Sequence, residues 1–231
     1  MSKSIISKKI LFWYDNNKRI LPWRKNTSKE QKLYFTLVSE FMLQQTQVST
    51  VIPYFKRFVQ KIPNFKKLSK ANDQTLMKLW EGLGYYSRAR NLKKSAIMIN
   101  GKFGGILPSN FEDLKSLPGV GDYTSTAIMA IAFNQKFIPL DGNVERILKR
   151  VLYLRNENDI SKENMQISKN FFGLSERASD YAQAIMELGA LVCRPTSPLC
   201  EKCPISMNCI SYKRKDFSLI KKTKKNKIKY F

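Results

Sequence analysis

The sequence predicts an all-α fold, and three features of its pattern support this prediction. Apolar residues recur at steps of three and four in residues 76–80, 92–99 and 128–132, as on one face of a helix. Two segments match the capping box that opens helices. No stretch alternates apolar and polar residues as the strands of a hairpin do, so helices are expected throughout.

The predicted helices follow one another with tight turns between them. The first capping box, Ser28–Gln31, precedes the apolar run Leu33–Met42, and the second, Ser109–Glu112, opens a short helix that ends at Leu117–Gly119. Glycines and prolines between the periodic segments keep each helix short. We therefore expect many short helices, without internal repeats.

Composition restricts the chemistry before any motif is considered. The chain of 231 residues contains no histidine, which excludes Ser-His-Asp hydrolases, Cys-His proteases and histidine-based acid–base catalysis. Its 41 Lys and Arg against 18 Asp and Glu give a formal charge of +23. This charge favours a polyanionic partner: nucleic acid first, an acidic membrane surface second. The 43% of hydrophobic residues is enough to fill a core.

The segment Leu117–Thr124 joins two predicted helices through a Gly-x-Gly turn that we expect only glycine to tolerate. Such a turn directs the free amides of the second helix outward. There, with the helix dipole, they suit one DNA phosphate without reading sequence. We therefore expect Gly119 and Gly121 to contact the DNA backbone in a helix-hairpin-helix motif over residues 111–133. The alternative is a plain glycine turn between packed helices.

All four cysteines lie within a segment of 17 residues. No signal-peptide pattern opens the sequence, so we expect a reducing, cytoplasmic location, where clustered cysteines indicate a metal centre. Four thiolates without histidine hold zinc or a [4Fe–4S] cluster. A zinc ribbon usually has two separated Cys-x2-Cys knuckles and this loop has one, so we expect a [4Fe–4S] cluster, with zinc and free structural thiols as alternatives. The expected ligands are Cys193, Cys200, Cys203 and Cys209.

The hairpin, the segment Leu140–Val144 and the Cys-x6-Cys-x2-Cys-x5-Cys loop together resemble the endonuclease III superfamily of helix-hairpin-helix DNA glycosylases. Within it, the segments Ser39–Val48 and Gly82–Asn91 resemble the adenine DNA glycosylase family. The resemblance runs from about Leu11 to Cys209.

Two helical subdomains follow from the resemblance. Residues 23–135 are expected to form a six-helix subdomain with the hairpin. Residues 1–22 with 136–212 are expected to form a helical subdomain with the [4Fe–4S] cluster loop, and residues 213–231 a basic tail or linker.

The same resemblance assigns two carboxyl groups to catalysis. Removal of a purine needs an acid for the departing base and an anion beside the developing oxocarbenium ion. Glu40, in an almost uncharged segment, is expected to have a raised pKa and to protonate adenine at N7. Asp141 is expected to stabilise the cation or bond to it transiently. Without the resemblance, Glu40 is a solvated helix residue and Asp141 a helix N-cap. Tyr123 and Asn143 complete the implied catalytic residues.

Tyr123 stands where the bifunctional branch of the superfamily has a lysine that forms a Schiff base with the sugar and cuts the strand. Tyrosine has no amine, so the resemblance implies a monofunctional enzyme that leaves an abasic site. Two alternatives stay open: a thymine or uracil mismatch glycosylase on the same scaffold, and an iron–sulfur DNA-binding protein without catalysis.

Other positions match residues that handle the duplex in the resembling family once adenine is flipped out of the stack. Gln45 and Tyr85 match residues that wedge in beside the opposite base. Arg88 and Arg90 are expected on phosphates or on a solvated helix face. Four positions match the lining of the adenine pocket, with a core aromatic and helix-surface residues as the plain alternatives: Trp23, Arg24, Gln183 and Glu187.

The expected partner is double-stranded DNA with adenine opposite 8-oxoguanine or guanine, bound by a monomer in the cytoplasm, at the nucleoid of a bacterial-type cell. No stretch is long and apolar enough to cross a membrane. Residues 213–231 are too short and charged to bury a core. Residues 228–231 are similar to the start of a strand that opens an 8-oxoguanine-reading domain in the family. We therefore expect less preference for A·8-oxoguanine over A·G than a two-domain relative has.

Overall fold

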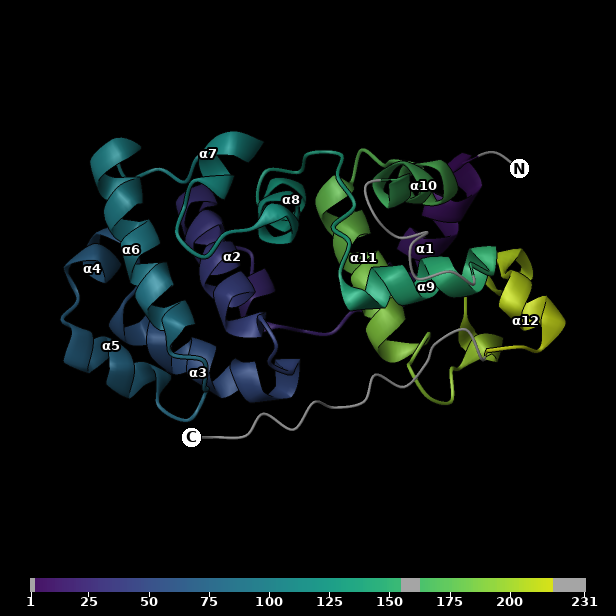
Figure 1. The fold of residues 1–231 in the computed structure, drawn as a ribbon, viewed down its shortest axis with the longest axis horizontal. Helices are drawn as coiled ribbons and strands as arrows, with labels where there is room; N and C mark the ends of the chain where they lie inside the picture. Colours follow the sequence, from purple (N-terminus) through teal and green to yellow (C-terminus); the bar gives the residue numbers. More distant parts are fainter. Residues whose placement is uncertain (1–2, 155–162, 218–231) are drawn as a thin grey trace. The chain divides into compact units, whose positions relative to one another are not determined.

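The computed structural model describes residues 3–154 and 163–217, and every regular element in this part of the chain is a helix (Figure 1). The predicted all-α fold is thus confirmed. Residues 218–231 lie outside the described residues, so the expected start of a strand at residues 228–231 stays a prediction. None of the described helices is long and apolar enough to cross a bilayer.

The chain divides into two compact units, which we call the hairpin unit and the cysteine unit. The hairpin unit comprises Asn17–Pro139 and Ser175–Ala182, and the cysteine unit comprises the described residues of Met1–Asn16, Leu140–Leu174 and Gln183–Phe231. The hairpin unit contains η1 (Pro22–Arg24), α2 (Lys29–Leu43), α3 (Val48–Lys61), α4 (Phe65–Lys70), α5 (Asp73–Trp80), α6 (Ser87–Lys102), α7 (Phe111–Lys115) and α8 (Asp122–Ile131).

The cysteine unit is built from segments far apart in the sequence. It contains most of α1 (Lys3–Asn17), α9 (Gly142–Leu152), α10 (Glu163–Phe172), most of α11 (Ala178–Leu191), η3 (Cys200–Lys202), η4 (Ser206–Asn208) and α12 (Ile210–Arg214). The apolar face of α9, with Val144, Ile147, Leu148 and Val151, is buried, and α12 packs against this helix.

Helix α2 is the central element of the hairpin unit. Its N-cap is Ser28, whose hydroxyl accepts a hydrogen bond from the amide of Gln31 at 3.2 Å, as the first capping box predicts. All ten residues from Leu33 to Met42 are buried, because α3, α6, α8 and η1 pack around the helix (Figure 1). A helix that is covered on all sides belongs to the core, so any polar side chain in this run is held inside the unit.

The second capping box differs from the prediction in its capping residue. Helix α7 is capped by Asn110, whose side chain accepts from the amide of Asp113 at 2.9 Å, and Ser109 lies one residue too early. The turn from α7 to α8 passes through Gly119 in the left-handed region, with φ of 82°. A Cβ there would lie 2.9 Å from both Asn91 and Phe41, so this position requires glycine for space as well as for backbone conformation.

Candidate active site

Glu40 lies inside the buried run of α2. Its side chain is 7% exposed, and its neighbours Val38 and Phe41 are fully buried. The plain alternative, a solvated helix residue, is therefore wrong. Its carboxyl group is therefore held inside the hairpin unit, where a group that acts on a flipped base is kept away from bulk water.

Asp141 is the N-cap of α9. One carboxylate oxygen accepts from the amides of Asn143 at 2.9 Å and Val144 at 2.7 Å, and the other accepts from the Asn143 side chain at 2.8 Å. The N-cap geometry that the residue pattern allows is thus present. Three donors and the positive end of the helix fix the carboxylate and stabilise its negative charge.

Arg146 extends this network towards the cysteine loop. Its Nη2 donates to the side-chain oxygen of Asn143 at 2.7 Å and to the carbonyl of Gly189 at 2.8 Å, and its Nε donates to the carbonyl of Cys193 at 2.8 Å. A continuous set of hydrogen bonds therefore joins Asp141 to the first cysteine. In the sequence, the only signal for Arg146 is its position one helical turn after Asn143.

Gly189 is a second residue of the site that no sequence motif marks. A Cβ at this position of α11 would lie 2.5 Å from the Cβ of Asn143 and 3.1 Å from its backbone. Helix α11 and the start of α9 therefore touch at a point where only glycine fits. The signal in the sequence is a glycine inside a helix, which costs about 1 kcal/mol relative to alanine and so suggests a packing reason.

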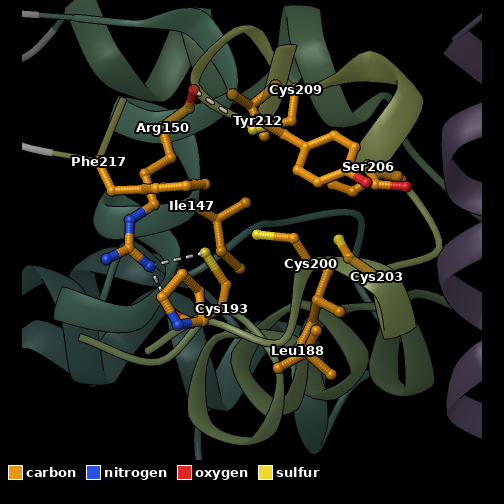
Figure 2. A pocket seen from close by; sticks show the side chains of 14 residues that line it. Ile147, Arg150, Leu188, Cys193, Cys200, Cys203, Ser206, Cys209, Tyr212 and Phe217 are labelled. Carbon is orange, nitrogen blue, oxygen red and sulfur yellow. Dashed lines mark hydrogen bonds between the residues drawn. The ribbon is translucent and has the colours of Figure 1, made fainter. Parts of the chain in front are cut away.

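The four cysteines line one pocket of the cysteine unit, together with apolar side chains that include Ile147 and Leu188 (Figure 2). Cys193 follows α11, Cys200 begins η3, Cys203 follows η3, and Cys209 is the N-cap of α12. Figure 2 shows the Arg150 guanidinium beside Cys193, where its Nη1 donates to the sulfur at 3.4 Å. The Cys209 thiol donates to the Arg150 carbonyl at 3.5 Å.

The chemistry of this pocket suits a cationic group held by thiolates. Burial raises the pKa of Cys200 and Cys209 and raises that of Cys203 to about 12, and the charges of neighbouring sulfurs raise all three further. Four thiolates are therefore stable there only with a compensating cation, and donor sets of this kind bind zinc or iron–sulfur clusters. Among the described residues, no group of three or more Cys, Asp or Glu side chains has the arrangement that would hold a single metal ion.

The hairpin of the hairpin unit has two glycines with different roles. Gly119 is required by its positive φ and close neighbours, whereas Gly121 has φ of −97° and open space around it. The expectation that backbone conformation requires both glycines is thus wrong for Gly121. Gly121 is the exposed N-cap of α8, so the free amides of this helix start at an accessible surface.

Two turns of the hairpin unit present the residues expected to enter the duplex. Gln45 and Tyr85 are exposed, and both have positive φ, 56° and 49°. Arg88, by contrast, is 6% exposed and donates to backbone carbonyls, so neither a phosphate contact nor a solvated helix face describes it. Arg90 is exposed.

The positions expected to line the adenine pocket lie on both units. Trp23 packs its ring edge-on against Phe55 at 5.3 Å, as a core aromatic does, and the neighbouring Arg24 donates to the carbonyl of Arg19 at 3.4 Å. On α11, Gln183 is 9% and Glu187 1% exposed, so the alternative of helix-surface residues is wrong for both.

The predicted residues thus fall into two sets, each within one unit. The hairpin unit holds Arg24, Glu40, Gln45, Tyr85, Gly119, Gly121 and Tyr123. The cysteine unit holds Asp141, Asn143, Gln183, Glu187, Cys193, Cys200, Cys203 and Cys209.

Known proteins share this fold and much of this sequence. The family described as HhH-GPD superfamily base excision DNA repair protein matches residues 38–172. An adenine DNA glycosylase of Rattus norvegicus is 44% identical over 89% of this chain and 41% of its own length. That of Buchnera aphidicola subsp. Acyrthosiphon pisum is 38% identical over 100% of this chain and 67% of its own length.

Among solved structures, a thermostable thymine-DNA glycosylase matches with a TM-score of 0.80 and 27% identity, over 92% of this chain and 97% of that one. The chain spans about two fifths of the length of the rat relative.

Proposed function

Because the chain belongs to the HhH-GPD superfamily of base excision DNA repair proteins, we propose that it is a monofunctional DNA glycosylase that removes adenine mispaired with 8-oxoguanine or guanine. The observation that carries the chemistry is the pair of carboxyl groups: Glu40, buried in α2, and Asp141, fixed at the start of α9. The similarity to adenine DNA glycosylases supports adenine as the base.

The proposed reaction is hydrolysis of the N-glycosidic bond. Glu40 gives its proton to the ring nitrogen N7 of adenine, so that the base departs as a neutral molecule. Three hydrogen-bond donors hold the Asp141 carboxylate in place, and its charge offsets that of the oxocarbenium ion. Water, deprotonated by Glu40, then adds to the sugar carbon, which leaves free adenine and an abasic site.

DNA binding is proposed to rest on charge and on two kinds of contact. The formal charge of +23 attracts the duplex, and the start of α8 at Gly121 takes a phosphate. Gln45 and Tyr85 fill the gap that the flipped adenine leaves in the stack, and Arg24, Gln183 and Glu187 contact the base. We expect the protein to act as a monomer, in the cytoplasm.

Tyr123 is proposed to separate this chain from glycosylases that also cut the strand. It lies in the first turn of α8, and a phenol forms no Schiff base with the sugar. Base removal therefore leaves the strand intact.

We propose a [4Fe–4S] cluster as the group that Cys193, Cys200, Cys203 and Cys209 hold. The support is an all-thiol donor set that lines one pocket. The cluster supplies a rigid, charge-compensating centre for the loop, which carries Arg194 and Lys202 towards the DNA backbone.

A panel of four duplexes tests the proposed substrate. DNA with A·8-oxoguanine, A·G, T·G or U·G is incubated with the protein and then treated with hot alkali, which breaks abasic sites. We expect breaks at adenine in the first two duplexes. The similarity to a thymine-DNA glycosylase structure favours one alternative, and breaks at T·G but not at adenine would establish it.

A further inference from the structure

Arg88 is a buried cation with an unusual set of partners. It lies in the first turn of α6 and is 6% exposed. Its guanidinium donates to five backbone carbonyl groups and to no carboxylate: those of Phe41, Met42, Gln44, Leu83 and Gly84. Its donors at Nη1 and Nη2 are therefore engaged within the protein and are not available to DNA.

The five carbonyl groups belong to two separate segments of the chain. Nη1 donates to the carbonyl groups at the end of α2, those of Phe41, Met42 and Gln44, and the distance to the Met42 oxygen is 2.8 Å. These carbonyls have no partner within the helix and carry the negative end of its dipole, so a cation there is favourable. Nη2 binds the turn after α5, at 3.2 Å to Leu83 and 3.1 Å to Gly84. One planar guanidinium thus joins the two segments.

Each of the two segments leads directly into a residue of the proposed DNA wedge. Gln45 follows Gln44 with φ of 56°, and Tyr85 follows Gly84 with φ of 49°. Residues other than glycine adopt this left-handed backbone region only when the surrounding structure holds them there. The Tyr85 ring also lies against the Arg88 guanidinium, 5.4 Å from carbon to ring centroid.

We propose that Arg88 is a positioning residue that holds the Gln45 and Tyr85 turns together in their strained conformations, so that both side chains enter the duplex as one wedge. The inference rests on the proposed function, because it assumes that these two side chains contact DNA. Arginine suits this role and lysine does not, since two nitrogens of a rigid fork reach two segments at once, whereas lysine is a single point charge.

A double-mutant cycle tests the proposal. Arg88→Lys and Arg88→Gln are made in the wild-type chain and in a Gln45→Ala/Tyr85→Ala chain. The control is Lys94→Gln, which removes an exposed charge from the same helix. Circular dichroism and the thermal unfolding midpoint report folding, and two Arg88 variants are used so that the failure of one to fold leaves the other.

The affinity readout is independent of base excision, because its duplex carries a tetrahydrofuran abasic analogue that has no base to remove. A second duplex carries 2-aminopurine opposite guanine, and the early rise of its fluorescence reports the base leaving the stack. We expect Arg88→Lys to reduce the fluorescence rise and to weaken binding of the abasic duplex by about 10-fold or more, with misplacement of the wedge as the cause. In the Gln45→Ala/Tyr85→Ala chain, the same substitution is expected to weaken binding of the abasic duplex by less than about twofold.

Equal losses in the two backgrounds would overturn the proposal, because Arg88 would then act only on general stability. Failure of the wild-type chain to excise adenine would instead contradict the proposed function. The affinities for the abasic duplex would still test the role of Arg88, because they do not depend on excision.

Discussion

Gly189→Ala tests whether the contact between α11 and α9 sets the geometry of Asp141. The new Cβ would lie 2.5 Å from the Cβ of Asn143, where carbon atoms normally approach to about 3.5 Å. The start of α9 must therefore move by roughly 1 Å. Asn143 donates twice to Asp141, so the carboxylate moves with it. A misplacement of this size in a catalytic group costs about 10²-fold in rate.

The effect on stability should be much smaller than the effect on rate. Overpacking costs about 1–3 kcal/mol, and the better helix propensity of alanine returns about 1 kcal/mol. Gly101→Ala is the matched control, because Gly101 is also inside a helix but a Cβ there meets nothing within 4 Å. The single-turnover rate of excision on A·8-oxoguanine DNA and the unfolding free energy are measured for each variant. Together they separate an effect on catalytic geometry from an effect on stability. A Gly189→Ala rate within about twofold of wild type would refute the reasoning.

Three further predictions concern Glu40, the hairpin glycines and the cysteine loop. Glu40→Gln should keep fold and DNA affinity yet lose base excision by about 10²-fold or more in single-turnover assays, because general-acid catalysis is worth that much; substantial excision by this variant would refute the assignment. Gly119→Ala should lower the unfolding free energy by about 1–3 kcal/mol, because of its positive φ and two close neighbours, whereas Gly121→Ala should not; equal effects in denaturant titrations would contradict this. The purified chain should contain about four irons and absorb broadly near ~400 nm, and a colourless protein with one zinc would exclude the cluster.

The sequence predicts the helical class well, because its signals are local. Ser28 and the apolar run that follows it lie within a few turns of one another, and α2 begins where they indicate. The second capping box shows the limit: Ser109 and Asn110 are both good N-caps, and the fold uses Asn110.

The site is less predictable where it depends on contacts distant in sequence. Three of the five carbonyl groups that bind Arg88 lie more than 40 residues earlier in the chain, so the basic, polar segment around this arginine does not reveal its burial. Gly189 likewise packs against Asn143, which lies 46 residues earlier in the chain. Asp141 shows that a helix N-cap and a proposed catalytic role are compatible, because the bonds that cap α9 also fix the carboxylate.

The most direct test of the central account measures the fate of the base and of the strand in one reaction. A duplex with a single A·8-oxoguanine pair is incubated with the wild-type chain, free adenine is quantified, and strand breaks are counted before and after alkali. We expect stoichiometric release of adenine with strand breaks only after alkali, and loss of both in Glu40→Gln. Strand breaks before alkali, or retention of adenine in the duplex, would contradict it.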